Sequence, residues 1–338
     1  MPAEQRVLIT GAGGFIGTVL AQKLLKQGYK SNPVKVRGLF LPGENAAELA
    51  SLGAEVVRGD ITRPETLQGI GEGCEVVFHL AARVSEWGSR DLFRKFIVNG
   101  TENLLKAVSG HCKRFVYYSS FAVLGYRYRD LVGLDEEADR VYTGIPYCDA
   151  KIDAEDLVKS FCGKKGIDYT IIRPANVIGP RSATVTGVIE ALLKGTCPLI
   201  GGGKAPGSFV YVDNLVDGTL LASELNIARN RVYLFRDEYD FTWGEFARTL
   251  GGWIGREPKG NIPLRLGYIG GTILEAILTP LGIKPPLTRL TAVWMGRNND
   301  VDCTRAKTEL RWKSKISLRE ALGEIEKWVK EDYLPEKR

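Results

Sequence analysis

Histidine and methionine are scarce in this sequence, with two of each among 338 residues. The six cysteines form no C-x-x-C pair, so no zinc site or other metal centre is expected. Cysteines in such an arrangement are typical of reduced thiols, which indicates a cytoplasmic location. The net charge is only +6, and charges of both signs are interspersed. Without a clustered basic stripe, a nucleic-acid partner is not expected.

Long uninterrupted hydrophobic runs are also missing. The longest apolar segment, Leu264–Ile283, contains Arg265, Glu275 and Pro280. A helix that spans a bilayer needs about 20 predominantly apolar residues, so this segment is a poor candidate. The first residues lead directly into a strand pattern, without the basic and apolar regions of a signal peptide. Residues 264–283 are nevertheless unusually apolar for a surface segment.

Short apolar strand patterns alternate with helical patterns in the first half of the chain. The expected strands are Val7–Thr10, Val34–Leu41, Glu55–Arg58, Val76–Leu80, Phe115–Ser119 and Tyr169–Ile172. The expected helices are Phe15–Lys26, Ala46–Leu52, Pro64–Ile70, Leu92–Val108 and Tyr147–Phe161. Nearly continuous apolar strands indicate a parallel sheet that is covered on both faces. We therefore expect an α/β fold, a Rossmann-type doubly wound parallel sheet over 1–180.

The alternation decays after about residue 180. Glycines and prolines cluster at 198–207 and 251–263, and short strands are expected at Phe209–Val212 and Val232–Phe235. This pattern predicts that residues 181–338 form a smaller C-terminal substrate lobe, interleaved with the first domain.

A glycine-rich turn joins the first strand to the first helix. Its residues are Gly11, Ala12, Gly13, Gly14, Phe15, Ile16 and Gly17. Gly11 permits the tight turn, Gly14 allows the backbone to approach a pyrophosphate, and Gly17 allows close packing of the helix. The helix N-terminus then offers free N–H groups to the anion. The sequence therefore predicts a dinucleotide site here.

The choice between NAD and NADP stays open at this point. The second strand ends in Arg37-Gly38-Leu39-Phe40-Leu41, without an acid for the ribose 2′-hydroxyl and without a basic residue for a 2′-phosphate. Arg37 could face the cofactor or lie on an exposed strand face. The absence of Arg and Lys from the glycine turn favours NAD.

Tyr147 and Lys151 lie four residues apart at the start of an expected helix, on one face. An ammonium close to the phenol would lower its pKa toward the range useful for acid–base catalysis. Ser119 and Ser120 end a strand whose carboxyl end should line the ligand crevice. We interpret Ser120 as the hydroxyl that binds a substrate carbonyl and Ser119 as a turn cap.

Together these motifs resemble the extended short-chain dehydrogenase/reductase family, of the NAD-dependent epimerase/dehydratase type. Further matching segments are Gly59-Asp60, His79–Ala82, Asn99–Thr101, Arg173-Pro174 and Tyr211–Asn214. The resemblance implies Ser120, Tyr147 and Lys151 as catalytic residues. It also implies cofactor contacts from Asp60, Ile61, Leu80, Ala81, Ala82, Pro174, Asn176 and Val177, besides the glycine turn and Tyr147/Lys151. His79 we interpret as structural, and Asn99 as a support for the active site through water or, alternatively, a helix amide bonded to its own backbone.

Val84–Gly88 and the segments around 284–288 and 302–307 resemble the 3β-hydroxysteroid dehydrogenase-like branch. This implies a hydroxyl/ketone oxidoreductase acting on a hydrophobic substrate, a 3β-hydroxysteroid or a β-hydroxy/β-keto acyl compound. Ser85, Trp87 and Asn99 would then be the residues on the substrate side of the site. Residues 264–283 would roof that site or touch a membrane surface, or else form a core helix pair.

Two other functions share this fold. A nucleotide-sugar dehydratase would carry an acidic pair after Ser120, where this chain has Phe121 and Ala122, but an epimerase stays open. A non-catalytic cofactor-binding sensor would be expected to lack the Tyr147/Lys151 pair. Family resemblance further implies a homodimer, paired through helices 92–108 and 147–161 across a two-fold axis. Their surplus apolar residues are Phe93, Phe96, Ile97, Leu104, Ile152, Leu157, Val158 and Phe161.

Overall fold

The computed structural model describes residues 5–125 and 129–337. A parallel sheet of seven strands occupies the centre, in the order β10-β6-β5-β4-β1-β2-β3. The strands are β1 Arg6–Thr10, β2 Lys35–Phe40, β3 Glu55–Arg58, β4 Cys74–His79, β5 Arg114–Tyr118, β6 Asp168–Pro174 and β10 Arg231–Phe235. In this order the strands run outward from β1 to β3 on one side and from β4 to β10 on the other, so the strand order reverses between β1 and β4. Doubly wound sheets bind their ligands at such a point. The expected fold is confirmed.

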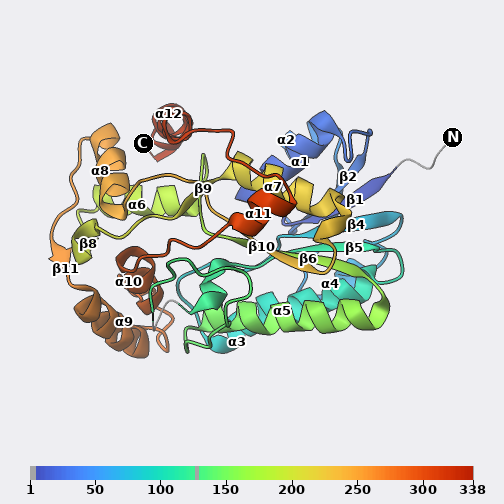
Figure 1. The fold of residues 1–338 in the computed structure, drawn as a ribbon. Coiled ribbons are helices and arrows are strands. Elements are labelled where there is room, and N and C mark those ends of the chain that lie inside the picture. Colours follow the sequence, from blue (N-terminus) through green and yellow to red (C-terminus); the bar gives the residue numbers. More distant parts are fainter. Residues whose placement is uncertain (1–4, 126–128, 338) are drawn as a thin grey trace.

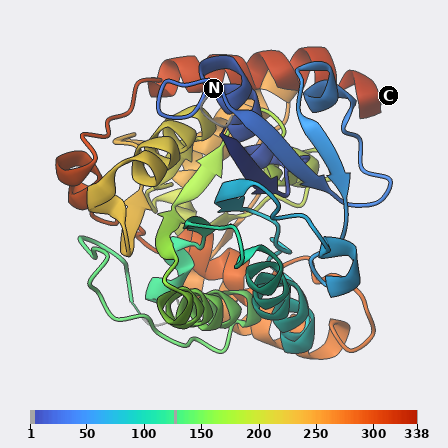
Figure 2. The same ribbon diagram turned by 90° about the vertical axis from the view of Figure 1, so that its right-hand side faces the viewer.

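Helices cover both faces of the sheet, as its apolar strands require (Figures 1 and 2). One face carries α1 Phe15–Gln27 and α7 Val212–Glu224, with α2 Ala47–Ser51 beside them. The other face carries α4 Gly100–Val108 and α5 Pro146–Lys165, with the short α3 Arg90–Phe93. Each face has its own buried hydrophobic cluster, so the sheet is the wall between two cores.

Most expected elements of the first half are confirmed within one or two residues, and three differ. Helix α5 continues to Lys165, four residues beyond the expected end at Phe161. The helix expected at 92–108 is divided into α3, a π-helical turn over Arg94–Asn99 and α4. The helix expected at 64–70 is a 3₁₀ turn, Pro64–Leu67. Another 3₁₀ turn, Phe121–Leu124, follows β5.

The second half builds a lobe at the carboxyl ends of the strands and also returns to the sheet. Lobe elements are α6 Ala183–Leu193, α8 Trp243–Ile254, α9 Leu264–Leu278 and α10 Arg289–Gly296, with the strand pairs β7 Asn176–Ile178/β9 Phe209–Tyr211 and β8 Leu199–Ile200/β11 Asn261–Ile262. Strand β10, α7, α11 Thr304–Glu309 and α12 Leu318–Trp328 pack with the first domain. The division at residue 180 thus stays an interpretation of two parts that interleave. Among the described residues, no helix is both long and apolar enough to cross a bilayer.

Candidate active site

The glycine turn has the geometry that an approaching pyrophosphate requires. A Cβ on Gly17 would lie 2.0 Å from the Gly11 carbonyl oxygen, and one on Gly11 would lie 3.0 Å from the Ala81 nitrogen. Both glycines therefore serve close packing of backbone on backbone. A Cβ on Gly14 would meet only the Gly11 oxygen, at 3.2 Å, so the space in front of it is open. The turn fits a dinucleotide, with the N-terminus of α1 directed at the phosphates.

A buried histidine fixes the ends of the neighbouring strands. The His79 ring lies 2.7 Å from the Thr10 hydroxyl through Nδ1 and 2.9 Å from the Thr101 hydroxyl through Nε2. The Thr10 hydroxyl also accepts the Ala81 N–H. Burial lowers the pKa of His79 to about 3, so the ring is neutral. This network joins β1, β4 and α4 behind the expected cofactor strip of Leu80, Ala81 and Ala82, and it agrees with a structural role for His79.

Tyr147 lies in the first turn of α5, where Pro146 begins the helix. Its ring packs edge-on against Phe93, and its phenol lies close enough to the Ser120 hydroxyl for that hydroxyl to lower the phenol pKa. Ser120 also accepts the Ala122 N–H, so the capping role expected of Ser119 belongs to Ser120. Burial raises the pKa of the Tyr147 phenol and outweighs the Ser120 hydrogen bond. The phenol is therefore protonated at neutral pH, contrary to the expected lowering.

Lys151 is buried one helical turn farther along α5. Its ammonium donates to the Tyr118 carbonyl oxygen at 2.6 Å and lies 5.0 Å from the Tyr117 ring centroid. Burial lowers the Lys151 pKa to about 7, partly offset by the charge of Glu155. The structure thus places Ser120, Tyr147 and Lys151 together at the carboxyl end of β5.

An ion pair that was not predicted fixes α5 to the sheet. The Arg173 guanidinium, on β6, donates to both carboxylate oxygens of Glu155 at 2.8 and 2.7 Å, and both side chains are buried. Despite the cost of burial, hydrogen bonds from Arg173 hold the pKa of Glu155 below its usual value. Glu155 follows Lys151 by four residues, so this pair orients the helix face that carries the catalytic groups.

The expected adenine-side residues lie between β3 and α4. Asp60 accepts the Thr62 N–H at 2.8 Å, and Ile61 is buried against Gly100. Asn103, which was not singled out, donates to the Ile61 carbonyl oxygen at 2.9 Å. These contacts fix the 60–61 backbone at the sheet edge where the adenine side of the cofactor is expected.

The contacts of Arg37 show that it binds neighbouring protein groups and does not face the cofactor site. Its guanidinium is buried and bound to the Ile70 carbonyl oxygen at 2.8 Å and to Glu55 at 2.9 Å, away from any ligand role. Glu44, in the loop after β2, lies instead against the glycine turn. Its carboxylate accepts the Leu41 N–H, and a Cβ on Gly13 would lie 2.6 Å from Glu44 Oε1. Sequence spacing missed this acid because a loop, rather than the strand end, carries it.

The expected nicotinamide-side residues are buried at the start of the lobe. Asn176 donates to the Gly207 carbonyl oxygen and accepts the Trp294 indole N–H, so its amide is already engaged by protein. Pro174 ends β6 and is buried, and Val177 is half-buried. Of this group, only Val177 presents a partly exposed side chain.

Two of the three expected substrate residues share one loop. The Ser85 hydroxyl accepts the Trp87 N–H and donates to the Trp87 carbonyl oxygen. The Trp87 indole N–H donates to the Thr279 hydroxyl at the end of α9, at 3.0 Å. Asn99 is exposed at the end of the π-helical turn. The described residues therefore do not enclose Asn99 in the way that its expected role as an active-site support would require.

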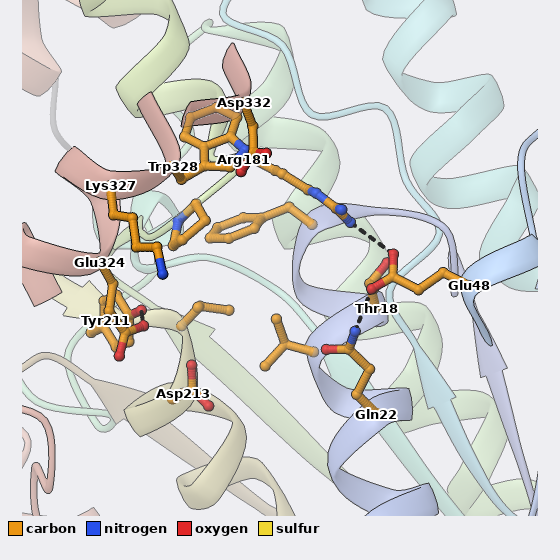
Figure 3. A pocket seen from close by; sticks show the side chains of 14 residues that line it. Thr18, Gln22, Glu48, Arg181, Tyr211, Asp213, Glu324, Lys327, Trp328 and Asp332 are labelled. Atoms are coloured by element: carbon orange, nitrogen blue, oxygen red, sulfur yellow. Dashed lines mark hydrogen bonds and ion pairs between the residues drawn. The ribbon is translucent and has the colours of Figure 1, made fainter. Parts of the chain in front are cut away.

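A separate cavity of about 380 Å³ lies between α1 and α12 (Figure 3). Phe15 lines this cavity with its ring. At the glycine turn, only the backbone of Phe15 is then left to contact a cofactor. Two contacts join side chains of the cavity lining: Arg181 pairs with Glu48, and the Tyr211 hydroxyl donates to Glu324. Tyr147 and Lys151 do not line this cavity, so it is distinct from the catalytic group.

Comparisons with known proteins agree with this geometry. The sequence model of the NAD dependent epimerase/dehydratase family matches residues 7–234. A 3 beta-hydroxysteroid dehydrogenase/Delta 5-->4-isomerase of Mycobacterium tuberculosis is 32% identical over 262 residues, which cover 72% of this chain and 68% of that protein. The 2-alkyl-3-oxoalkanoate reductase of Shewanella oneidensis is 25% identical over 333 residues, which cover 94% and 84%.

Among solved structures, a UDP-glucose 4-epimerase of Thermotoga maritima, in complex with UDP-glucose, superposes with a TM-score of 0.76 at 25% identity. The superposition covers 97% of this chain and 100% of that one. The family match extends from β1 to β10 and includes the glycine turn, Ser120 and the Tyr147/Lys151 pair. This chain is therefore a member of the NAD dependent epimerase/dehydratase family, an NAD(P)-dependent enzyme of the extended short-chain dehydrogenase/reductase type.

Proposed function

We propose that the protein interconverts a secondary hydroxyl and a ketone on a hydrophobic substrate, a 3β-hydroxysteroid or a β-hydroxy/β-keto acyl compound. The observation that carries this proposal is the apolar surroundings of Tyr147. Its ring packs on the same buried cluster as Leu264, Tyr268 and Trp294 of the lobe. Phe121, which directly follows Ser120, belongs to that cluster too. An apolar substrate gains about 25 cal/mol for each Å² buried against such walls.

In this mechanism the glycine turn would hold the dinucleotide, whose nicotinamide would supply or accept the hydride. Ser120 holds the substrate oxygen, and Tyr147 exchanges a proton with it. Because burial raises the pKa of Tyr147, the phenol enters ketone reduction already protonated. The Ser120 hydrogen bond stabilises the phenolate that remains. Lys151, bound to the Tyr118 carbonyl oxygen, holds a positive charge near the strand end below neutral pH.

The proposal extends to NAD as the preferred cofactor. Glu44 lies in the loop that follows the carboxyl end of β2, the edge where a dinucleotide fold places the adenosine ribose. A carboxylate accepts hydrogen bonds from a 2′-hydroxyl and repels a 2′-phosphate. Glu44→Gln should therefore narrow the difference between the dissociation constants for NAD and NADP, measured by calorimetry. An unchanged ratio would remove Glu44 from this role.

A nucleotide-sugar epimerase is the second candidate, because a solved structure of that activity has the same fold. Its substrate would require cations for the diphosphate. Arg181, one of the few candidates, already pairs with Glu48 at 3.1 Å. Two curated relatives bear names of ketone or hydroxyl chemistry on apolar compounds, which supports the first proposal.

The expected homodimer and location stay proposals. Of the apolar residues thought to pair two subunits, Phe93, Ile97, Leu104, Ile152 and Val158 are buried within one subunit. Phe96, Leu157 and Phe161 are partly exposed and carry what support remains. All six cysteines are free and buried, which supports a reducing, cytoplasmic environment. The membrane contact expected of residues 264–283 rests on the exposed face of α9.

A substrate screen tests the proposed function. Hydroxysteroids, β-hydroxyacyl compounds and UDP-sugars would be offered with NAD and with NADP while nicotinamide absorbance is followed. We expect turnover of the apolar alcohols alone. Epimerisation of a UDP-sugar, without turnover of any apolar alcohol, would refute the proposal.

A further inference from the structure

Helix α9 presents its apolar side chains outward. Leu266, Ile269, Ile273 and Ile277 are spaced by three or four residues, so they share one helix face. Leu281 and Ile283 follow the helix. These six residues, here called the apolar stripe, are each between 52% and 67% exposed. Six of the fourteen exposed large hydrophobic residues in the described parts of the chain therefore lie within this short segment.

The inner face of α9 is already packed, so the apolar stripe is not a core face awaiting closure. A Cβ on Gly271 would lie 2.7 Å from the Arg289 nitrogen, which shows how closely α9 packs against α10. Glu275 accepts from the Arg289 side chain at 2.8 Å and from its backbone N–H. The Glu275–Arg289 ion pair faces inward while the apolar stripe faces outward, the reverse of an ordinary surface helix. The outer face needs an external partner.

The charges around the apolar stripe favour an anionic surface. Between residues 258 and 288 the sequence has one acid, Glu275, and Arg289 already binds it. Three basic residues of the same span, Lys259, Arg265 and Lys284, are exposed. Lys284 pairs with Glu86 at 2.6 Å, so Lys259 and Arg265 are the two that make no ion pair within the described residues. A second copy packed symmetrically on this face would bring like charges together. An anionic bilayer would attract them and also accept the apolar side chains.

The end of α9 is connected to the loop that borders the active site. Thr279 accepts the Trp87 indole N–H, and Lys284 pairs with Glu86 at 2.6 Å. That loop follows Ala82, at the end of the expected cofactor strip. Tyr268 of α9 packs on the same cluster as Tyr147. A membrane bound to α9, which lies beside α10 in Figure 1, would therefore lie next to the Trp87 loop.

We propose that the apolar stripe of α9 docks the enzyme on an anionic phospholipid bilayer, with the helix axis in the plane of the interface. Docking would also deliver substrate, and this role rests on the proposed function: an apolar substrate concentrated in the bilayer would reach Tyr147 past the Trp87 loop. The docking itself requires only the apolar stripe and its basic neighbours.

Vesicle flotation tests the docking, with full-length protein and vesicles of phosphatidylcholine with or without phosphatidylglycerol. The test variant is Ile269→Ser/Ile273→Ser, and the matched control is Ile227→Ser, which removes an equally exposed side chain elsewhere. We expect the wild type and the control to bind phosphatidylglycerol vesicles, and the double variant to partition about tenfold less. Arg265→Gln should weaken binding to the anionic vesicles, and added salt should weaken it further.

Absence of wild-type binding, or equal binding by the double variant, would overturn the proposal. So would light scattering that shows a dimer in the wild type and a monomer in the double variant, without a change in flotation. Activity distinguishes docking from catalysis. A short, water-soluble substrate should turn over equally in the wild type and the double variant. Vesicle binding without any hydroxyl/ketone turnover would refute the proposed function and leave the docking intact.

Discussion

The catalytic edge of the sheet and the α9–α10 segment are built in opposite ways. At the edge, polar groups are buried and paired: His79 with two hydroxyls, Lys151 with the Tyr118 carbonyl oxygen, and Arg173 with Glu155. In the α9–α10 segment, the Glu275–Arg289 ion pair faces inward and apolar side chains face solvent. The edge holds the groups proposed for catalysis in fixed positions, whereas the α9–α10 segment leaves an apolar face open to an external partner.

Removal of the phenol should have the largest effect. Tyr147→Phe deletes the proton donor but keeps the ring that packs on Phe93. Turnover should fall by about 10²- to 10⁴-fold, the usual contribution of general acid–base catalysis. Cofactor affinity, measured by calorimetry, should change little. Near-normal turnover would exclude Tyr147 from the mechanism.

Loss of the buried ion pair comes next. Glu155→Gln leaves the Arg173 charge buried without its partner, which should cost about 3–5 kcal/mol of unfolding free energy in urea. The control is Glu102→Gln, which breaks the exposed Glu102–Lys106 pair. That change should cost less than about 0.5 kcal/mol. Similar losses in the two variants would contradict the difference between buried and exposed polar groups.

Lys151 makes stability depend on pH. Its folded-state pKa is about 7, and an unfolded lysine titrates near 10.4. Between these values the unfolded chain binds more protons, so the free energy of unfolding rises with pH, by at most about 1.4 kcal/mol per pH unit. Below about pH 7 both states are protonated and the slope vanishes. Lys151→Met should remove this slope in urea titrations of cofactor-free protein; equal slopes would mean that folded Lys151 stays charged.

Two glycines of the same turn should separate binding from folding. Gly14→Val meets little protein and should reduce NAD and NADP affinity at least about tenfold, while the melting temperature stays near the wild-type value. Gly17→Ala meets the Gly11 carbonyl and should instead lower the melting temperature. Calorimetry and thermal melts on both variants check this; unchanged affinity in Gly14→Val would refute the phosphate assignment.

Much of the catalytic edge could be predicted from the sequence, because its motifs act locally. The glycine turn, Ser120, Tyr147 and Lys151 are each set by the strand end or helix turn that carries them. Contacts between distant residues could not be read in this way. Glu44 against Gly13, Glu155 with Arg173, and the Asn176 amide bound to Trp294 all depend on how separate elements pack.

The sequence also could not weigh burial against charge. Spacing placed an ammonium near the Tyr147 phenol, but the pKa of that phenol is raised because desolvation dominates. The apolar character of residues 264–283 was visible, yet only the packing of Gly271 on α10 shows which face points outward.

The smallest effect is expected on the outer face of α9. Ile273→Ser should change the unfolding free energy by less than about 0.5 kcal/mol, because the side chain is already exposed. Ile152→Ala, in the cluster beneath Tyr147, should cost about 2–5 kcal/mol. A large loss from Ile273→Ser in chemical denaturation would mean that the apolar stripe serves folding.

The central claim, an apolar substrate site beside Tyr147, is tested most directly by competitive calorimetry on the enzyme–NAD complex. A hydroxysteroid and UDP are titrated separately and then in competition. We expect the steroid to bind and UDP to give no heat of binding. Tight binding of UDP that the steroid does not displace would contradict the account and identify a nucleotide-sugar site.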